Sequence, residues 1–416
     1  MLKNYLKIAI KVLLRRKFFT FISLFGISFT LVVLMVASAT FDHVFGPYSP
    51  EVKVDRTLGI YSVFMQSTDG RGGRTGPPGY GFLDRYVRTL PNVEKVSVFS
   101  LPSTEISFQS GEKTKLFFKR TDGEFWQIME FDFIEGAPFT PEDEKNANFV
   151  AVINAATRQK FFGDASAIGK TIEVDGQRFR VVGVVKNVPI FRLMPFADVW
   201  APISTAKDQS FRREFTGGFL ASILAKTPAD LDFIREEFKA RLDQVEFPDP
   251  TQFNKMIGAA ETFFESVARG LFSQDRSTED FSAHFLALLV SLMILFMLLP
   301  TINLVNINVS RIMERASEIG VRKAFGASSW TLVGQFVVEN VLLTLIGGAI
   351  GFVLAIGVLG MLTNSGMIPY AEFHLNYRIF LYGLGIALFF GLFSGVYPAW
   401  KMSRMHPVEA LRGRSL

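Results

Sequence analysis

One stretch of this chain contains the residue types of a nucleotide-binding site. It is Gly163-Asp-Ala-Ser-Ala-Ile-Gly-Lys-Thr171, and five residues separate its first glycine from Gly-Lys-Thr. A phosphate-binding loop has four residues in that place. The stretch also runs into a strand-like segment, residues 171–174, where a phosphate would need the first turn of a helix. We therefore expect no nucleotide to bind there.

The other catalytic residue types are dispersed along the chain. There is no cysteine, and the four histidines lack the spacing of zinc ligands; they are His43, His284, His374 and His406. Glu142, Asp143 and Glu144 follow Pro141, a pattern typical of a solvated surface turn. No Gly-x-Ser-x-Gly elbow occurs. The sequence thus predicts a protein that is not an enzyme and has no metal or cofactor site of its own.

A charged segment at residues 310–327 has the pattern of a surface that binds a protein partner. On a helix, its charged residues fall in one narrow stripe and its apolar residues fall on the other side. The stripe consists of Arg311, Glu314, Arg315, Glu318 and Arg322, and the apolar side of Val309, Ile312, Met313, Ala316 and Ile319. Glu318 and Arg322 are also spaced for a helical ion pair. Such a helix, held at a membrane face, can transmit a displacement caused by a soluble partner to both flanking helices.

Those flanking elements are long apolar runs. The 416 residues are 49% hydrophobic and only 20% charged, with a mean hydropathy of +0.27. A membrane-spanning helix needs about 20 apolar residues, and four runs qualify: 18–41, 285–305, 332–362 and 379–397. The first run exceeds the apolar core of a signal peptide, so we expect it to be retained although Ala37-Ser-Ala39 resembles a cleavage site. The prediction is a membrane α-helical protein with four transmembrane helices.

The basic residues predict the orientation of these helices, since Lys and Arg favour the cytoplasmic side. They precede the first run, occupy the 310–327 segment and recur in the tail: Lys3, Lys7, Lys11, Arg15, Arg16, Lys17, Arg311, Arg315, Arg322, Lys323, Lys401, Arg404, Arg412 and Arg414. Both termini are therefore expected in the cytoplasm. The net charge of +5 largely reflects this bias, which argues against nucleic-acid binding. Residues 2–14 form either an interfacial helix on the inner leaflet or a simple basic flank.

The segment between the first two runs is expected to form a large α+β extracytoplasmic domain. Strand-like stretches occur at residues 57–66, 93–98, 149–153, 171–174 and 179–185, and helix-like ones at 82–90 and 230–245. Asp175-Gly176 predicts a hairpin turn. The glycine- and proline-rich residues 69–81 form either a mobile surface connector or a contact through Arg71, Arg74 and Tyr80.

Small residues recur every four positions in the last two apolar runs. They are Gly347, Gly351 and Ala355 in one, and Gly383, Ala387, Gly391 and Gly395 in the other. Such stripes let helices approach closely in lipid, so they predict packing within the bundle or a dimer seam. Glu339 and Asn340 lie about two turns into the third run. They mark either a functional position inside the membrane or a site near its cytoplasmic surface.

Four motifs resemble the permease subunits of the MacB/FtsX/LolC-like ABC transporters, the type VII or mechanotransmission superfamily. They are Leu13-Leu-Arg-Arg-Lys-Phe-Phe19; Ile168-Gly-Lys-Thr-Ile172 with Phe179-Arg-Val-Val-Gly-Val184; Arg315-Ala-Ser-Glu-Ile-Gly-Val-Arg-Lys-Ala-Phe-Gly-Ala327; and Tyr397-Pro-Ala399 with Pro407-Val-Glu-Ala-Leu-Arg412. Glu339 also matches a position that is often acidic in the family. The resemblance covers nearly the whole chain.

The resemblance implies a domain layout. It comprises a cytoplasmic amphipathic helix (1–17), transmembrane helices (18–41, 285–305, 332–362 and 379–397), a periplasmic domain (42–281), a cytoplasmic coupling helix (309–327), a short periplasmic loop (364–377) and a cytoplasmic tail (398–416). Within the periplasmic domain, porter-like parts at about 42–141 and 203–281 would flank an inserted, mostly β subdomain at about 142–202. The protein would reside in the inner membrane.

The resemblance also implies partners. A cytoplasmic ABC ATPase dimer on separate polypeptides would bind ATP and Mg and contact the coupling helix through Arg311, Glu314, Arg315, Glu318, Ile319, Gly320, Arg322 and Lys323. The permease would pair with a second copy or a paralogue, and an adaptor and outer-membrane channel would complete an efflux system. The implied function is export of peptides, antibiotics or similar compounds. Two alternatives remain: release of lipoproteins, or signalling to a periplasmic cell-wall hydrolase without transport.

Overall fold

The computed structural model describes residues 2–109, 112–273, 278–314, 321, 325, 328–373 and 375–403. The chain divides into two compact units. The helical unit comprises Met1–His43, Ala287–Met367 and Phe373–Leu416, and the α+β unit comprises Val44–Leu286 and Ile368–Glu372. Two helices, α2 (Lys17–Phe45) and α9 (Ser282–Glu314), run without a break across the boundary between the units.

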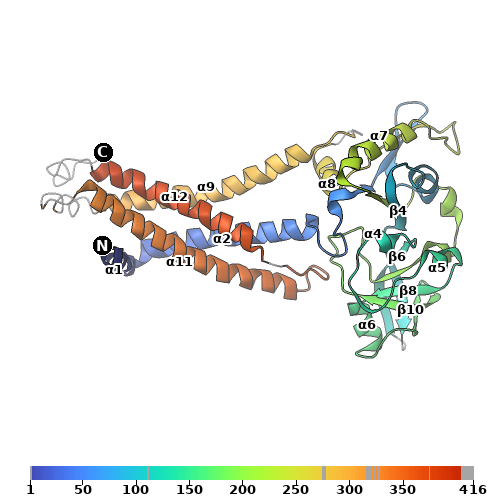
Figure 1. The fold of residues 1–416 in the computed structure, drawn as a ribbon, viewed down its shortest axis with the longest axis horizontal. Coiled ribbons are helices and arrows are strands. Elements are labelled where there is room, and N and C mark those ends of the chain that lie inside the picture. Colours follow the sequence, from blue (N-terminus) through green and yellow to red (C-terminus); the bar gives the residue numbers. More distant parts are fainter. Residues whose placement is uncertain are drawn as a thin grey trace. The chain divides into compact units, whose positions relative to one another are not determined.

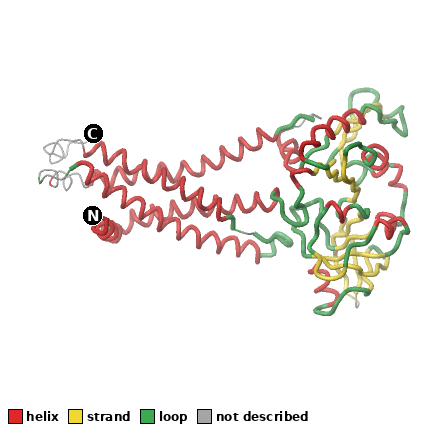
Figure 2. The backbone as a smooth tube through the Cα atoms, viewed as in Figure 1, coloured by secondary structure: helices red, strands yellow, loops and turns green. Residues whose placement is uncertain are grey.

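The helical unit is built from long helices (Figures 1 and 2). Besides α2 and α9 they are α1 (Leu2–Arg15), α11 (Ser329–Asn364) and α12 (Tyr377–Ser403). In the part of the chain that the structure describes with side chains, α2 and residues Val333–Asn364 of α11 are long and apolar enough to cross a membrane. Shorter apolar stretches occupy Ser282–Leu298 of α9 and Tyr377–Phe389 of α12. Four crossings therefore stay a prediction.

The α+β unit contains all the strands of the described chain. They are β1 (Thr57–Ile60), β2 (Val63–Ser67), β3 (Gly73–Gly76), β4 (Val93–Ser100), β5 (Ser103–Gln109), β6 (Glu112–Thr121), β7 (Phe133–Gly136), β8 (Val150–Asn154), β9 (Thr171–Val174), β10 (Gln177–Val185), β11 (Val199–Pro202), β12 (Phe219–Ala225) and β13 (Phe253–Gly258). Its helices are α3 (Tyr80–Phe82), α4 (Phe125–Ile128), α5 (Pro141–Lys145), α6 (Ala155–Phe162), α7 (Leu231–Leu242) and α8 (Phe263–Phe272). Short helical turns are η1 (Val54–Arg56), η2 (Leu83–Val87), η3 (Ile203–Thr205), η4 (Ser210–Arg213) and η5 (Pro228–Asp230).

Ten strands form one mixed sheet in the order β1-β12-β4-β6-β11-β8-β10-β7, with β5 paired to β6 and β9 paired to β10. Most pairs are antiparallel, but β11 runs parallel to β6, and β10 parallel to β8. The central strands β8, β11 and β12 are buried along their whole length. Such continuous burial explains why they are mostly apolar, with Asn154 and Ser222 as the polar residues, rather than alternating. The strands of residues 142–202 share this sheet with β4, β6 and β12, so the inserted subdomain stays a prediction.

The strand expected at residues 57–66 is two strands in different sheets. β1 pairs with β12 in the large sheet, whereas β2 is the centre of a second sheet with the order β13-β2-β3. The chain changes sheets at Tyr61 and Ser62. The glycine-rich residues 69–81 are also more ordered than a mobile connector, because β3 pairs with β2 and α3 follows it. Tyr80 is buried and stacks edge-on against Phe211 and Phe219.

Other local predictions are confirmed. β9 and β10 form a hairpin in which Val174 pairs with Gln177, and Asp175 and Gly176 both have positive φ, at 54° and 63°. Two positive φ angles are the geometry of a type I′ turn. Helix α7 buries Ile234, Phe238 and Leu242 as its spacing predicts. The helix expected at residues 82–90 starts earlier, at Tyr80, and ends at Val87 with a wide π-turn.

Candidate functional site

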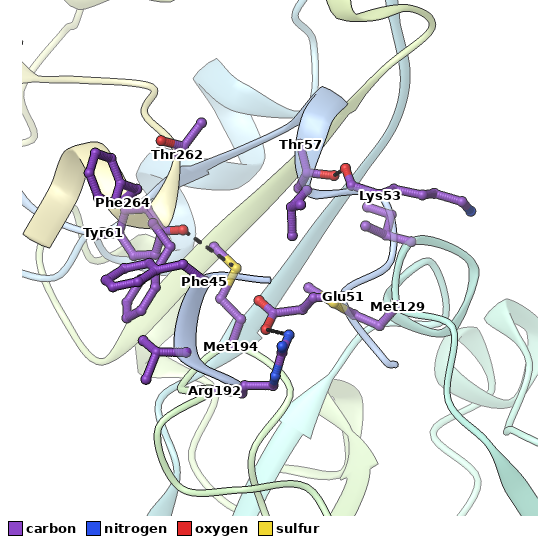
Figure 3. Close-up of a pocket in the computed structure, with 14 residues that line it drawn as sticks. Phe45, Glu51, Lys53, Thr57, Tyr61, Met129, Arg192, Met194, Thr262 and Phe264 are labelled. Atoms are coloured by element: carbon purple, nitrogen blue, oxygen red, sulfur yellow. Dashed lines mark hydrogen bonds and ion pairs between the residues drawn. The ribbon is translucent and has the colours of Figure 1, made fainter. Parts of the chain in front are cut away.

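A cavity of about 220 Å³ lies inside the α+β unit (Figure 3). The end of α2, the linker that follows it, the loop between β10 and β11, and the start of α8 surround it. Its wall consists of Val44, Phe45, Glu51, Lys53, Val54, Thr57, Tyr61, Ile128, Met129, Arg192, Met194, Thr262, Phe263 and Phe264. One side is thus aromatic and the other carries an ion pair between Glu51 and Arg192.

The aromatic side is positioned by a helix cap. Thr262 and Glu265 form a capping box at the start of α8, with the Thr262 amide donating to Glu265 at 2.6 Å. The cap places Phe263 and Phe264 against Phe45, with ring centroids 5.7 and 5.3 Å apart. The Tyr61 hydroxyl contacts the Met194 sulfur at 3.7 Å across the cavity wall. Burial raises the pKa of Tyr61, and the nearby carboxylates add to the effect.

The ion pair fastens the linker that follows α2. Arg192 is buried, with 2% of its side chain exposed, and its Nη1 donates to Glu51 Oε2 at 3.1 Å. The same guanidinium donates to the carbonyl oxygens of Tyr48 at 3.2 Å and Gly46 at 2.8 Å. Charged hydrogen bonds of this kind are stronger than neutral ones. Burial raises the pKa of Glu51, and the positive charges of Arg192 and Lys119 oppose that shift.

Lys119 is a second buried cation beside this ion pair. Its ammonium donates to the carbonyl oxygen of Leu193 at 2.9 Å and also to that of Met194. Burial lowers the pKa of Lys119 from 10.5 to about 7, and the charge of Glu51 partly offsets the shift. The lysine therefore titrates near neutral pH while it supports the loop that carries Arg192.

A further buried network joins the β10–β11 loop to residues 368–372. The Tyr370 hydroxyl donates to Asp198 Oδ1 at 2.7 Å, and Asn154 Nδ2 donates to the same oxygen at 2.9 Å. The other carboxylate oxygen accepts from the Phe117 amide at 2.8 Å. Burial and the Asp198 carboxylate raise the pKa of Tyr370, so its hydroxyl stays protonated and donates. The Ile190 amide also donates to the Pro369 carbonyl at 3.3 Å.

The predicted ATPase-coupling residues are only partly described. The backbone of Arg311 and Glu314 forms the last turn of α9. The others, Arg315, Glu318, Ile319, Gly320, Arg322 and Lys323, lie outside the described residues. Their role as a coupling surface stays a prediction.

The small residues of α11 and α12 line helix contacts within the chain. A Cβ added at Gly347 would meet Ile27 at 2.9 Å, and one at Gly351 would meet the Ser28 carbonyl at 3.1 Å. Gly383 faces Leu31, and Gly391 faces Thr344. Ala355 is buried and Ala387 half-buried, while Gly395 lies in the helical backbone of α12. These contacts join α2, α11 and α12, and a dimer seam stays a prediction.

The polar pair in α11 is buried inside the helical unit. Glu339 and Asn340 are 5% and 8% exposed. Gln335, one turn earlier, donates to Glu339 Oε1 at 3.0 Å. The carboxylate is therefore held by a neighbour on its own helix.

The remaining sequence candidates are the histidines, the acidic residues after Pro141 and the phosphate-loop-like stretch. No group of three or more His, Asp or Glu residues there could hold a metal ion. In the phosphate-loop-like stretch, α6 ends before Gly163 and the chain continues into β9. Asp143 caps its own helix α5, accepting from Thr140. Asp143 thus has a local structural role.

Sequence reasoning missed Arg192, Lys119, Asp198 and Tyr370. A usable signal existed for Arg192, which is the one charge in the apolar stretch Pro189-Ile-Phe-Arg-Leu-Met-Pro195. A single charge among apolar residues is expensive to bury without a partner. Lys119 had no such signal, because it follows two phenylalanines on a strand with several lysines.

Comparison with known proteins places this arrangement in a family. The MacB-like periplasmic core domain matches residues 20–241, and the FtsX-like permease C-terminal domain matches residues 290–407. The ABC transporter permease YvrN of Bacillus subtilis is 26% identical over 81% of this chain and 80% of its own length. The macrolide export ATP-binding/permease protein MacB of Bdellovibrio bacteriovorus is 27% identical over 67% of this chain, which spans 41% of that relative. The solved extracellular domain of the transporter YknZ from Gram-positive bacteria has 17% identity and a TM-score of 0.34, covering 45% of this chain and 93% of that domain. This chain belongs to the family of MacB/FtsX-type ABC transporter permeases.

Proposed function

We propose that this chain is a permease subunit that couples ATP hydrolysis by a separate cytoplasmic ATPase to movement of its α+β unit. The observation that carries the proposal is the match along most of the length of YvrN and of YknZ, both named ABC transporter permeases. MacB, by contrast, is named an ATP-binding/permease protein, and this chain matches only part of it. The α+β unit is the part that we expect to move outside the membrane.

The contact with the ATPase is proposed for residues 309–327. Arg311, Glu314, Arg315, Glu318, Ile319, Gly320, Arg322 and Lys323 would form it, with ATP and Mg bound by the partner. The sequence supports this through the charged stripe and the flanking apolar runs.

Charge reversal tests the contact. Glu318→Lys combined with Arg322→Glu keeps the net charge but reverses two of the five charges of the stripe. We expect loss of co-purification with the ATPase and at least a roughly tenfold drop in complex-dependent ATP hydrolysis. The matched control is Glu173→Lys with Arg178→Glu, an exposed pair 3.4 Å apart on the β9–β10 hairpin. If the 318/322 variant behaves like the control, the coupling assignment is wrong.

The cargo proposed is a peptide, an antibiotic or a similar compound, exported with a periplasmic adaptor and an outer-membrane channel. The name of the MacB relatives, macrolide export proteins, supports this class. We expect the ATP hydrolysis of the assembled complex to rise when such compounds are added. Stimulation by lipoproteins, or by a cell-wall hydrolase without export, would redirect the proposal to release or to signalling.

The orientation and the pairing are also proposals. Both termini would be cytoplasmic, and a second copy or a paralogue would complete the permease. The absence of cysteine from the chain makes labelling clean. Ser365→Cys should react with an impermeant maleimide added outside intact cells, whereas Lys401→Cys should react only after lysis. The reverse result would contradict the orientation.

A further inference from the structure

We propose that the loop between β10 and β11, residues 186–198, is a bracket that holds two membrane-helix linkers on one rigid support. The first linker, residues 46–51, continues directly from α2, and the second, residues 368–372, lies between α11 and α12. Its role in transmitting motion rests on the proposed function, whereas the two anchors themselves do not.

The first anchor is Arg192. Its guanidinium binds three acceptors on one linker: the carbonyls of Gly46 and Tyr48 and the carboxylate of Glu51. It also lies over the Tyr48 ring, 5.8 Å from the ring centroid. A planar guanidinium that satisfies several acceptors at once holds a fixed geometry, which a flexible lysine would not. Removing the side chain would leave the half-buried Glu51 carboxylate and two carbonyls without this donor.

The second anchor combines Asp198 and Ile190. Asp198 is 4% exposed and accepts the Tyr370 hydroxyl. The Ile190 amide donates to the carbonyl of Pro369, which is the residue that precedes Tyr370. Tyr370 adopts a positive φ of 60°, which a tyrosine rarely adopts. The surrounding contacts must therefore outweigh this strain, and the Asp198 hydrogen bond is the strongest candidate among those described.

The bracket is itself fixed to the sheet. Lys119 on β6 binds the carbonyls of Leu193 and Met194, and the Trp200 indole donates to the Pro195 carbonyl at 3.0 Å. The Asp198 amide donates to the Phe117 carbonyl at 2.7 Å. The loop thus has sheet contacts along the same stretch that carries both anchors.

A displacement of either linker therefore reaches the same loop. The first linker has further contacts with the α+β unit, since Ser49 donates to the Glu130 carbonyl and the Pro50 carbonyl accepts from the Glu130 amide. In our proposal the bracket is the support that both linkers share. With it, the unit responds to both linkers together. Arg192 and Tyr370 are positioning residues in this scheme, since neither is placed to touch a cargo.

Hydrogen exchange of the full-length chain in nanodiscs tests the anchors. Arg192→Met should raise amide exchange in residues 46–51 at least tenfold, where the Glu51 amide donates to Tyr48, and leave residues 368–372 within twofold. Tyr370→Phe should do the reverse. Faster exchange in β12 would reveal that Arg192→Met has lost its fold. In that case Glu51→Gln, which keeps the side-chain shape, tests the first anchor instead.

Two matched controls remove equivalent bonds away from the linkers. Arg120→Met deletes a half-buried arginine that binds Thr205 and Gln177. Tyr86→Phe deletes a hydroxyl that accepts from the Glu246 amide. The bracket is wrong if Arg192→Met and Glu51→Gln raise amide exchange in residues 46–51 no more than Arg120→Met does. It is also wrong if Tyr370→Phe raises exchange in residues 368–372 no more than Tyr86→Phe does.

The transmission role is tested with the ATPase complex by comparing exchange in ATP and in ADP. Wild type should change at both linkers together, while each variant should change only at the linker whose anchor is intact. A wild-type complex that shows no nucleotide response contradicts the proposed function but leaves the anchors standing. Variants that respond at both linkers like wild type overturn the bracket.

Discussion

Replacing Gly347 by alanine should destabilise the helical unit, although alanine favours a helix more than glycine does. Gly347 lies on α11 where that helix contacts α2, and the added Cβ would lie 2.9 Å from both Cβ and Cγ2 of Ile27. Ile27 is 3% exposed, so it has little room to retreat. The Gly347 carbonyl also accepts a hydrogen bond from the Ser28 hydroxyl at 2.9 Å, which holds the two backbones close.

The expected magnitude comes from comparison with a glycine on the same helix. Gly357 has no neighbouring atom within 4 Å of an added Cβ. Alanine at either position gains about 1 kcal/mol of helix propensity. Only Gly347→Ala adds the penalty for overpacking a filled interface, about 1–3 kcal/mol. Gly347→Ala should therefore be about 1–3 kcal/mol less stable than Gly357→Ala.

The assay is unfolding of the purified chain in mixed micelles, with the helical signal followed as SDS is added. The double variant Gly347→Ala with Ile27→Gly supplies the interaction energy, because glycine at position 27 removes both the Cβ and the Cγ2 that the new methyl group would meet. We expect positive coupling of at least about 1 kcal/mol. Equal stability of the two single alanine variants, together with no coupling to Ile27, would refute the α2–α11 contact.

Three further predictions concern the α+β unit. The pKa of Lys119 falls from 10.5 to about 7 on folding, so between these pH values the unfolded chain holds a proton that the folded chain lacks. The free energy of unfolding, relative to that of Lys119→Met, should therefore rise by up to about 1.4 kcal/mol per pH unit from about pH 7.5 to 9.5. The difference in melting temperature between the two proteins measures this rise. Gly136→Ala should lower the free energy of unfolding by about 3 kcal/mol or more, because Gly136 has φ +65° and an added Cβ would lie 2.1 Å from the Val182 carbonyl oxygen. A variant as stable in urea as the wild type would contradict this. Asp122→Asn should cost about 3 kcal/mol in thermal unfolding, because the buried carboxylate pairs with Arg88 at 2.6 Å; a change below 0.5 kcal/mol would show that the pair adds little.

Local patterns predicted the parts of the fold that local rules govern. The Asp175-Gly176 turn needs only two residues that tolerate positive φ, and α7 needs only apolar residues at helical spacing. The break at Tyr61 between two sheets was not predictable in this way. It depends on which distant strands, β12 and β13, lie beside β1 and β2.

The candidate site was less predictable still. Arg192 and Glu51 are far apart in sequence, and each alone resembles an ordinary polar residue of a loop. Asp198 meets Tyr370 only because the loop between α11 and α12 joins the α+β unit. The helices and the family were visible in the residues, whereas the anchors required the tertiary contacts.

The pairing of β1 with β12 also orders events during biosynthesis. β12 leaves the ribosome about 160 residues after β1, a delay on the order of ten seconds at ordinary rates of translation. Until then Leu58 and Ile60, both fully buried in the finished sheet, have no partner strand. An unpaired apolar strand readily joins another chain. We therefore expect a nascent chain of this permease that stalls before residue 219 to be bound by chaperones and degraded by quality-control proteases.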